Sequence, residues 1–226
     1  MASDALLDTY SEERVYAARE NIRFASKGAE FMSPPSKPHQ LMRDAVLSLS
    51  VRHPELTSLM SPRQHSANDY AGSSLNFVTT DDHTFEAGPR AGMSLPECPL
   101  HLLQDGIGRD GFLTQLLGPW FTLLMFTDRP VDATLAHAVE RMAQRVPLRM
   151  RIIVGAAATV PDDAAAIDTT GRCCKLYGVA GACGYLVRPD GHLLARWRSP
   201  TAADLERALR HVPGLTALSG AAACAA

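Results

Sequence analysis

The feature that most constrains the fold of this chain is an alternation of strand and helix patterns in its second half. Residues 121–126 have the pattern of a buried strand, residues 131–145 carry apolar side chains at helical spacing, and residues 149–154 have the pattern of a second strand. Two buried strands joined by a helix are typical of a parallel strand–helix–strand unit. This half of the chain is therefore predicted to belong to the α/β class.

The segments after this unit complete a defined order of elements. Residues 161–177 are expected to be partly helical, and two strand-like runs flank the turn Pro189-Asp190-Gly191 as a hairpin. Ser199 or Thr201 is expected to cap a last helix. The order strand, helix, strand, helix, hairpin, helix is that of a thioredoxin-like domain, with a central mixed sheet flanked by helices. We therefore predict that fold.

The first sixty residues are predicted to be helical. Apolar residues recur every three or four positions over residues 9–32, where Thr9 and Glu12 match a capping box. A second helix is predicted over residues 38–51, followed by a short turn. Both helices have apolar faces that little else in this segment can cover. The residues of these faces are Val15, Ala18, Ile22, Ala25, Ala29, Leu41, Met42, Ala45, Val46 and Leu49.

Between the helical segment and the α/β region lies a long stretch without periodicity. Residues 61–98 are rich in Pro, Gly, Ser, Asn and Asp, which is typical of an ordered connector. A connector of this length is expected to wrap over another part of the molecule. The predicted organisation is a helical segment over 1–60, this connector, a thioredoxin-like domain over 99–214 and an Ala-rich tail over 215–226.

Charge and composition argue against several classes of function. The 22 basic and 24 acidic side chains nearly cancel and form no dense basic run, so nucleic acid and anionic membrane are not expected as partners. The longest apolar run, residues 120–126, is far shorter than the roughly 20 residues that a membrane helix needs. The acidic N-terminus does not resemble a leader, and the odd set of cysteines has no regular spacing. We expect reduced thiols in a cytoplasmic protein.

The two sequence features that support disulfide exchange in a thioredoxin-like protein are missing. A CxxC motif follows the first strand in such proteins, and a cis-proline loop precedes the hairpin. Thr127-Asp128-Arg129-Pro130 occupies the first place without a cysteine, and residues 179–184 occupy the second without a proline. The alternative of a free-standing thioredoxin- or peroxiredoxin-like thiol enzyme would have to use Cys173, Cys174 or Cys183. Such a thiol would need a depressed pKa and access to solvent.

Two other motifs are weak. Residues 106–111 match the dinucleotide fingerprint GxGxxG, but only residues 112–117 could form the helix after it, which is too short to cross a sheet. A glycine-rich turn is favoured, and nucleotide binding stays as a third reading. Cys173, Cys174 and Cys183 lack the spacing of a zinc site, and no histidine is placed for a catalytic triad. No catalytic, cofactor-binding or metal-binding residue is therefore assigned.

Several phrases of the sequence carry a more specific resemblance to a known family. They are LLDTYSEER over residues 6–14, ARENI over residues 18–22, GPRAGM over residues 88–93 and LVRPDGHLLARW over residues 186–197. Together they resemble the last part of the class A flavoprotein monooxygenases, particularly the phenol and 3-(3-hydroxyphenyl)propionate hydroxylases. The resemblance covers most of the chain.

This resemblance implies a chemistry and a division of labour. In the family, FAD forms a flavin hydroperoxide that hydroxylates a phenolic ring, with NAD(P)H as the reductant. The FAD-binding residues lie in an upstream domain with no counterpart here, so this chain is expected to bind no cofactor and to be inactive alone. The family's thioredoxin-like domain supports structure and subunit contacts. We therefore expect a homo-oligomer, such as a dimer, or docking of the helical apolar faces on an FAD-containing domain.

Overall fold

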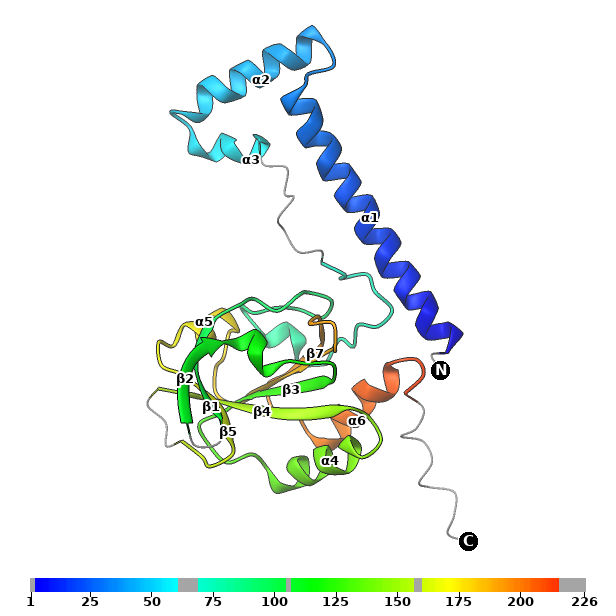
Figure 1. The fold of residues 1–226 in the computed structure, drawn as a ribbon, viewed down its shortest axis with the longest axis vertical. Coiled ribbons are helices and arrows are strands. Elements are labelled where there is room, and N and C mark those ends of the chain that lie inside the picture. Colours follow the sequence, from blue (N-terminus) through cyan, green and yellow to red (C-terminus); the bar gives the residue numbers. More distant parts are fainter. Residues whose placement is uncertain (1–2, 61–68, 105–106, 157–159, 216–226) are drawn as a thin grey trace. The chain divides into compact units, whose positions relative to one another are not determined.

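The computed structural model describes residues 3–60, 69–104, 107–156 and 160–215 (Figure 1). The strands are β1 (Pro99–Gln104), β2 (Ile107–Phe112), β3 (Phe121–Phe126), β4 (Leu148–Gly155), β5 (Ala164–Asp168), β6 (Cys183–Val187) and β7 (Leu193–Trp197). The helices are α1 (Asp4–Met32), α2 (Lys37–Ser50), α3 (Thr57–Met60), α4 (Ala133–Ala143), α5 (Arg172–Leu176) and α6 (Ala202–His211). Short 3₁₀ helices cover Pro54–Leu56, Asp82–Thr84 and Leu113–Leu116. The chain divides into two compact units, residues 1–9 with 69–226 and residues 10–68.

All seven strands belong to one mixed sheet in the order β2-β1-β5-β4-β3-β6-β7 (Figure 1). Strand β3 is parallel to β4 and antiparallel to β6, and β6 pairs antiparallel with β7. Helix α4 makes the crossover between β3 and β4. These elements have the predicted thioredoxin-like arrangement, so the fold prediction is confirmed.

Side-chain burial explains why these segments form a sheet with two covered faces. Every residue of β3 is buried, as expected for a central strand that packs on both sides. On one face Leu123 and Met125 pack with α4 and α6, and on the other Leu124 and Phe126 pack with α5. Thr201, one of the two caps that the sequence offered, caps α6 in a capping box with Asp204.

An additional hairpin and strand extend the sheet beyond the predicted elements. Strands β1 and β2 form an antiparallel pair, and β1 also pairs with β5. Residues 107–111 of the glycine fingerprint therefore lie in a strand, not in the turn that was favoured, and Gly106 lies outside the described residues. Residues 161–177 were expected to be partly helical, and the helix there is α5. Ala164–Asp168 forms strand β5 instead, which pairs with β4.

The segment over residues 69–98 packs along β7, on the edge of the sheet opposite to β2. The amides of Phe77 and Gly92 donate to the carbonyls of Leu194 and Leu193, and the amide of Leu193 donates to Met93. Backbone groups that an edge strand leaves open are thereby paired. The segment also buries its own apolar residues Tyr70, Leu75 and Phe85. This part of the expected connector does wrap over another element.

The N-terminal helices differ from the prediction at one end. Helix α1 begins at Asp4, before the predicted cap, and Thr9 lies inside it with its hydroxyl donating to the carbonyl of Leu6. The capping box at Thr9 and Glu12 was therefore wrong; instead, the amide of Leu6 donates to the hydroxyl of Ser3. Within the described part of the chain, no helix combines the length and the apolar content needed to cross a bilayer.

Candidate functional site

A small cavity lies where a thioredoxin-like protein would carry its redox site, after β3 and beside the loop that precedes β6. Its volume is about 180 Å³. The lining residues are Phe126, Thr127, Asp128, Ile153, Gly155, Cys174, Val179 and Gly181. They come from the carboxyl ends of β3 and β4, from α5 and from the loop before β6. The cavity therefore lies at the usual location of the redox site in this topology. The chemistry possible in the cavity depends on the side chains that line it.

The polar groups after β3 are engaged by the protein's own backbone. The Thr127 hydroxyl donates to the carbonyl of Arg129 and accepts from its amide, at 2.9 and 3.1 Å. The Asp128 carboxylate accepts from the amide of Gly155 at 3.2 Å. Asp132 caps α4 by accepting from the amides of Thr134 and Leu135. The helix N-terminus that would stabilise a thiolate in a redox protein is thus occupied by a carboxylate.

The loop opposite this segment has no cis-proline. Residues 179–182 hold no proline, and among the peptide bonds that the structure describes none is cis. Gly181 instead takes a left-handed conformation, with φ of 77°, at the cavity wall. The loop therefore makes its turn with glycine, and a backbone shaped to receive a disulfide substrate is absent from the described loop.

Cys174 is the one described cysteine that lines the cavity, and its environment opposes ionisation. Its backbone amide donates to the buried carboxylate of Asp168 at 2.8 Å. Burial, and then the hydrogen bond and negative charge of Asp168, raise the pKa of the Cys174 thiol to about 12. A reactive cysteine needs the opposite shift. Asp168 was not singled out from the sequence, because its contact with Cys174 depends on the unpredicted strand β5.

The other two cysteines of the thiol-enzyme alternative are buried in the core. Cys173 is fully buried in α5, and a hydrogen bond with Cys98, followed by burial, raises the pKa of its thiol. Cys183 is fully buried in β6, and burial raises its pKa to about 12. The thiols of Cys173 and Cys98 are therefore hydrogen-bonded to each other, and this contact depends on the unpredicted β1–β2 hairpin. Cys224 lies outside the described residues.

A second, larger cavity of about 390 Å³ is mainly apolar. Its lining residues are Ser3, Leu6, Leu75, Phe121, Arg188, Pro189, Asp190, Val212, Pro213, Gly214 and Leu215. The guanidinium of Arg188 and the carboxylate of Asp190 form an ion pair at 2.5 Å, so their charges offset each other at this wall. Neither cavity holds a metal-ligand set, and no group of three or more metal-binding side chains occurs among the described residues.

Comparison with known proteins gives matches among solved structures alone. No family model matches the sequence, and no curated protein matches it. The RebC-10x structure soaked with chromopyrrolic acid and holding 7-carboxy-K252c is 23% identical, with a TM-score of 0.55 over 95% of this chain and 37% of its own. The rebeccamycin biosynthetic enzyme RebC with reduced flavin is 21% identical, with a TM-score of 0.53 over 93% of this chain and 37% of its own.

The flavin-dependent monooxygenase PieE, solved with FAD and substrate, is 17% identical and superposes less closely, with a TM-score of 0.48 over 81% of this chain and 32% of its own. The chain therefore spans about a third of the length of these structures. At these identities the RebC matches establish likeness of fold. The chain folds like one part of a larger flavin enzyme.

Proposed function

We propose that this chain is the C-terminal, non-catalytic portion of an FAD-dependent aromatic-ring monooxygenase, with a structural and oligomerising role. The observation that carries the proposal is the likeness to RebC over 95% of the chain, together with the sequence phrases at residues 6–14 and 186–197. The cavity after β3 supports it, because its polar groups are bonded internally and its thiol has a raised pKa. The organisation predicted from the sequence, with boundaries after residues 60, 98 and 214, belongs to this proposal.

In this proposal the chain contributes no flavin-binding residue. FAD and NAD(P)H would be held by the larger part of the enzyme, in the cytoplasm. The glycine fingerprint offers no substitute site, because residues 107–111 lie in β2 with their backbone committed to a strand. A phosphate-binding loop needs free amides at the start of a helix.

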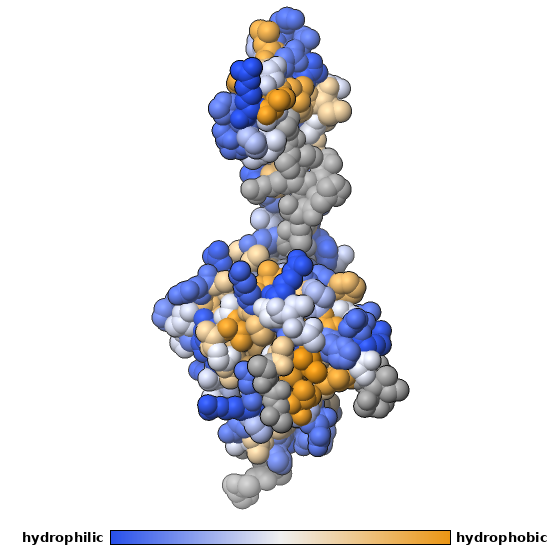
Figure 2. Space-filling model, turned by 90° about the vertical axis from the view of Figure 1, so that its left-hand side faces the viewer, coloured by the Kyte–Doolittle hydropathy of each residue, from blue (hydrophilic) through white to orange (hydrophobic). Residues whose placement is uncertain are grey.

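The helices of residues 10–60 supply the proposed contact surface. Ile22 is 66% exposed, Leu41 is 60% exposed and Met42 is 63% exposed. Figure 2 shows hydrophobic residues on this unit interspersed with hydrophilic ones. Apolar side chains exposed at this density in a small helical unit favour association. Their proposed partner is an FAD-containing domain or a second copy of the chain.

Light scattering after size-exclusion chromatography tests the association. We expect the full chain to elute as a dimer or a larger species, and Ile22→Glu with Leu41→Glu to shift it toward the monomer, because two charges would have to be buried. Lys27→Glu, an exposed change on α1, is the matched control and should leave the mass unchanged. A clean, stable monomer of the unmodified chain would contradict the proposed self-association.

Activity assays on the same preparation test the non-catalytic role. The purified chain should show no flavin absorbance, should not oxidise NADPH in the presence of a phenol, and should not reduce insulin disulfides. NADPH oxidation would show that the chain is catalytic alone. Reduction of insulin would support the thiol-enzyme alternative instead.

A further inference from the structure

Helix α1 carries a heptad repeat of apolar residues along one side. The repeat lies within residues 15–32, which belong to the unit of residues 10–68 (Figure 1). Its spacing alternates between three and four residues, as the a and d positions of a coiled coil do. All six residues of this seam are exposed to solvent, so the structure leaves the repeat uncovered. They are Val15, Ala18, Ile22, Ala25, Ala29 and Met32.

The side of α1 that is covered in the structure carries a charged residue. Glu13 is 4% exposed and Ala17 is 7% exposed. At 3.6 residues per turn, these two positions lie on a different side of the helix from the seam. A helix in a folded protein normally buries its apolar side and exposes its polar one. The bare apolar side of α1 therefore indicates a surface that packs against another molecule.

The charges beside the seam distinguish the two orientations in which copies of α1 can pair. With Val15 taken as an a position, Arg14 occupies a g position and Arg19 an e position. In a parallel pair, g of one helix faces the next e of the other, so Arg14 would meet Arg19 on both sides of the seam. In an antiparallel pair, e faces e, and Arg19 meets the neutral Ser26 of the second copy. The antiparallel orientation avoids this repulsion.

The sizes of the seam residues also fit an antiparallel pair, in which each a residue packs beside a d residue of the second copy. The layers of such a pair are Val15 with Met32, Ala18 with Ala29, and Ile22 with Ala25. At the centre a large residue faces a small one, whereas in a parallel pair Ile22 would face Ile22 between two layers of alanine, which fill space unevenly. A shift by one heptad would bring the charge of Asp8 into the seam, so a single register is favoured.

We propose that α1 forms an antiparallel two-stranded coiled coil with α1 of a second copy of this chain, through the seam of residues 15–32. The inference rests on the oligomerising role proposed above and specifies the partner and its orientation. The seam is about 27 Å long, at about 1.5 Å per residue. It spans only about two and a half heptads, so the dimer is expected to dissociate on dilution.

Cross-linking between introduced cysteines tests the orientation. Full chains carrying Ala18→Cys and full chains carrying Ala29→Cys, each with Cys224→Ser, are mixed and treated with a bismaleimide that has a two-carbon spacer. We expect a cross-linked dimer from the mixture and only background from either variant alone, because residue 18 faces residue 29 in the antiparallel pair. The chain with Cys224→Ser alone measures the background of the other native cysteines. Cross-linking of the Ala18→Cys chain with itself would show a parallel pair and overturn the proposal.

Light scattering on the same samples separates this inference from the proposed role of the chain. A dimer that does not cross-link in the mixture would show that the copies associate through another surface, which overturns this inference and leaves the oligomerising role in place. A monomer at every concentration from about 1 to 100 µM would contradict both.

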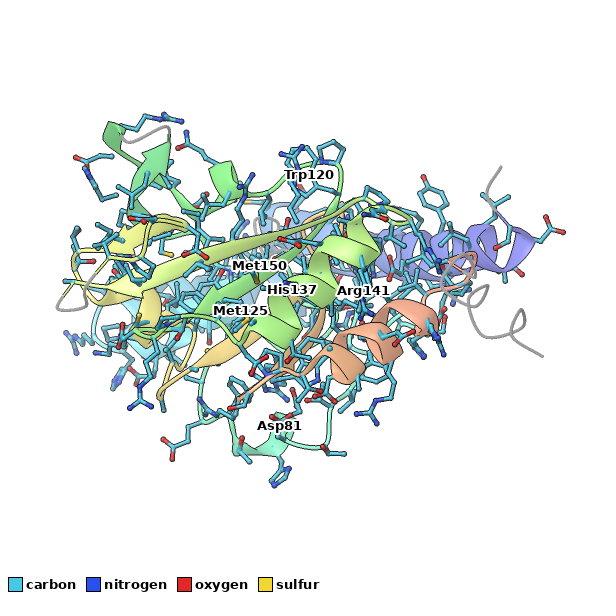
Figure 3. The ribbon with its side chains drawn as sticks, turned by 90° about the horizontal axis from the view of Figure 1, so that it is seen from below. Asp81, Trp120, Met125, His137, Arg141 and Met150 are labelled. Atoms are coloured by element: carbon cyan, nitrogen blue, oxygen red, sulfur yellow. The ribbon has the colours of Figure 1, made fainter. Side chains whose placement is uncertain are left out.

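Substitution within the seam measures its contribution to the dimer. Ala25→Glu should raise the dissociation constant by at least about tenfold, because it places a carboxylate in the seam of each copy. Alanine and glutamate both favour a helix, so α1 itself should persist. Arg141→Gln makes the same change of net charge on the exposed surface of α4 (Figure 3) and should leave the constant unchanged. Equal constants for these two variants, with unchanged circular dichroism, would refute the role of the seam.

Substitution beside the seam tests the orientation through charge. Ser26→Glu should tighten the dimer and Ser26→Lys should weaken it, each by about two- to tenfold, because residue 26 faces Arg19 of the second copy in the antiparallel pair. In a parallel pair residue 26 faces Asn21, so the two variants would have equal constants, which would contradict the proposed orientation.

Discussion

Replacement of Arg196 should reveal how far the folded domain depends on the segment that packs along β7. Arg196 is 3% exposed, and its Nε donates to the Asp82 carboxylate at 2.6 Å. One terminal nitrogen of the same guanidinium donates to the carbonyls of Ala87, Gly88 and Pro89 at 3.1–3.3 Å. The other terminal nitrogen donates to the carbonyl of Asp82 at 3.4 Å, so one side chain binds five acceptors of the segment to the edge strand.

The magnitude follows from the groups that Arg196→Met would leave behind. A partly buried carboxylate would lose its counter-ion and four carbonyls would lose a charged donor, so the free energy of unfolding should fall by about 3–5 kcal/mol. For a unit of this size the midpoint of thermal unfolding should drop by about 6–20 °C, at about 2–4 °C per kcal/mol. Methionine keeps much of the side-chain volume, so the loss is mainly of polar contacts.

The assay is urea unfolding followed by tryptophan emission. Both tryptophans, Trp120 and Trp197, lie in the unit that contains the sheet, so the signal reports on that unit. Arg207→Met is the matched control, because Arg207 is 68% exposed in an ion pair with Asp204 and its loss should cost less than about 1 kcal/mol. Equal stability losses for Arg196→Met and Arg207→Met would refute the reasoning.

Three further predictions concern single residues. The alkylation rate of Cys174 should keep rising with pH beyond 9, because burial and Asp168 raise its pKa to about 12 and little thiolate exists below that; a rate that levels off below pH 8.5 would support the thiol-enzyme alternative. Gly92→Ala should destabilise by more than about 1 kcal/mol in thermal unfolding, since φ is +89° and the added Cβ would lie 2.5 Å from the carbonyl oxygen of Tyr70. Gly72→Ala meets no atom within 4 Å and should be close to neutral. Thr201→Ala should cost about 1 kcal/mol through the lost cap of α6, and unchanged urea midpoints would contradict it.

The central strands and the last hairpin were predictable because their signals are local. A mostly apolar run marked Phe121–Phe126, and Pro189-Asp190-Gly191 marked the turn between β6 and β7. Strands β2 and β5 were not predictable in this way. Ala164–Asp168 has the composition of a helix, and Ile107–Phe112 has two glycines, so both are strands because of the neighbours with which they pair.

The candidate site was likewise predictable where its signals are local and unpredictable where they depend on neighbouring strands. The absence of cysteine at Thr127-Asp128-Arg129-Pro130 was readable once the first strand was placed. The contacts of the cysteines could not be predicted. Strand β5 places Asp168 beside Cys174, and the β1–β2 hairpin places Cys98 beside Cys173.

The structure also suggests how a domain of this topology can serve as a scaffold. In a redox protein the loop after the first strand keeps donors free for substrate, which leaves unpaired groups at that end of the sheet. Here Asp128 bonds to Gly155, Thr127 bonds to Arg129 and Asp132 caps α4. At the β7 edge the segment carrying Phe77 and Gly92 pairs backbone groups that would otherwise be open to another chain. Polar groups at the usual catalytic end and at one edge of the sheet are thus paired within the chain itself, so the proposed assembly would have to use other surfaces.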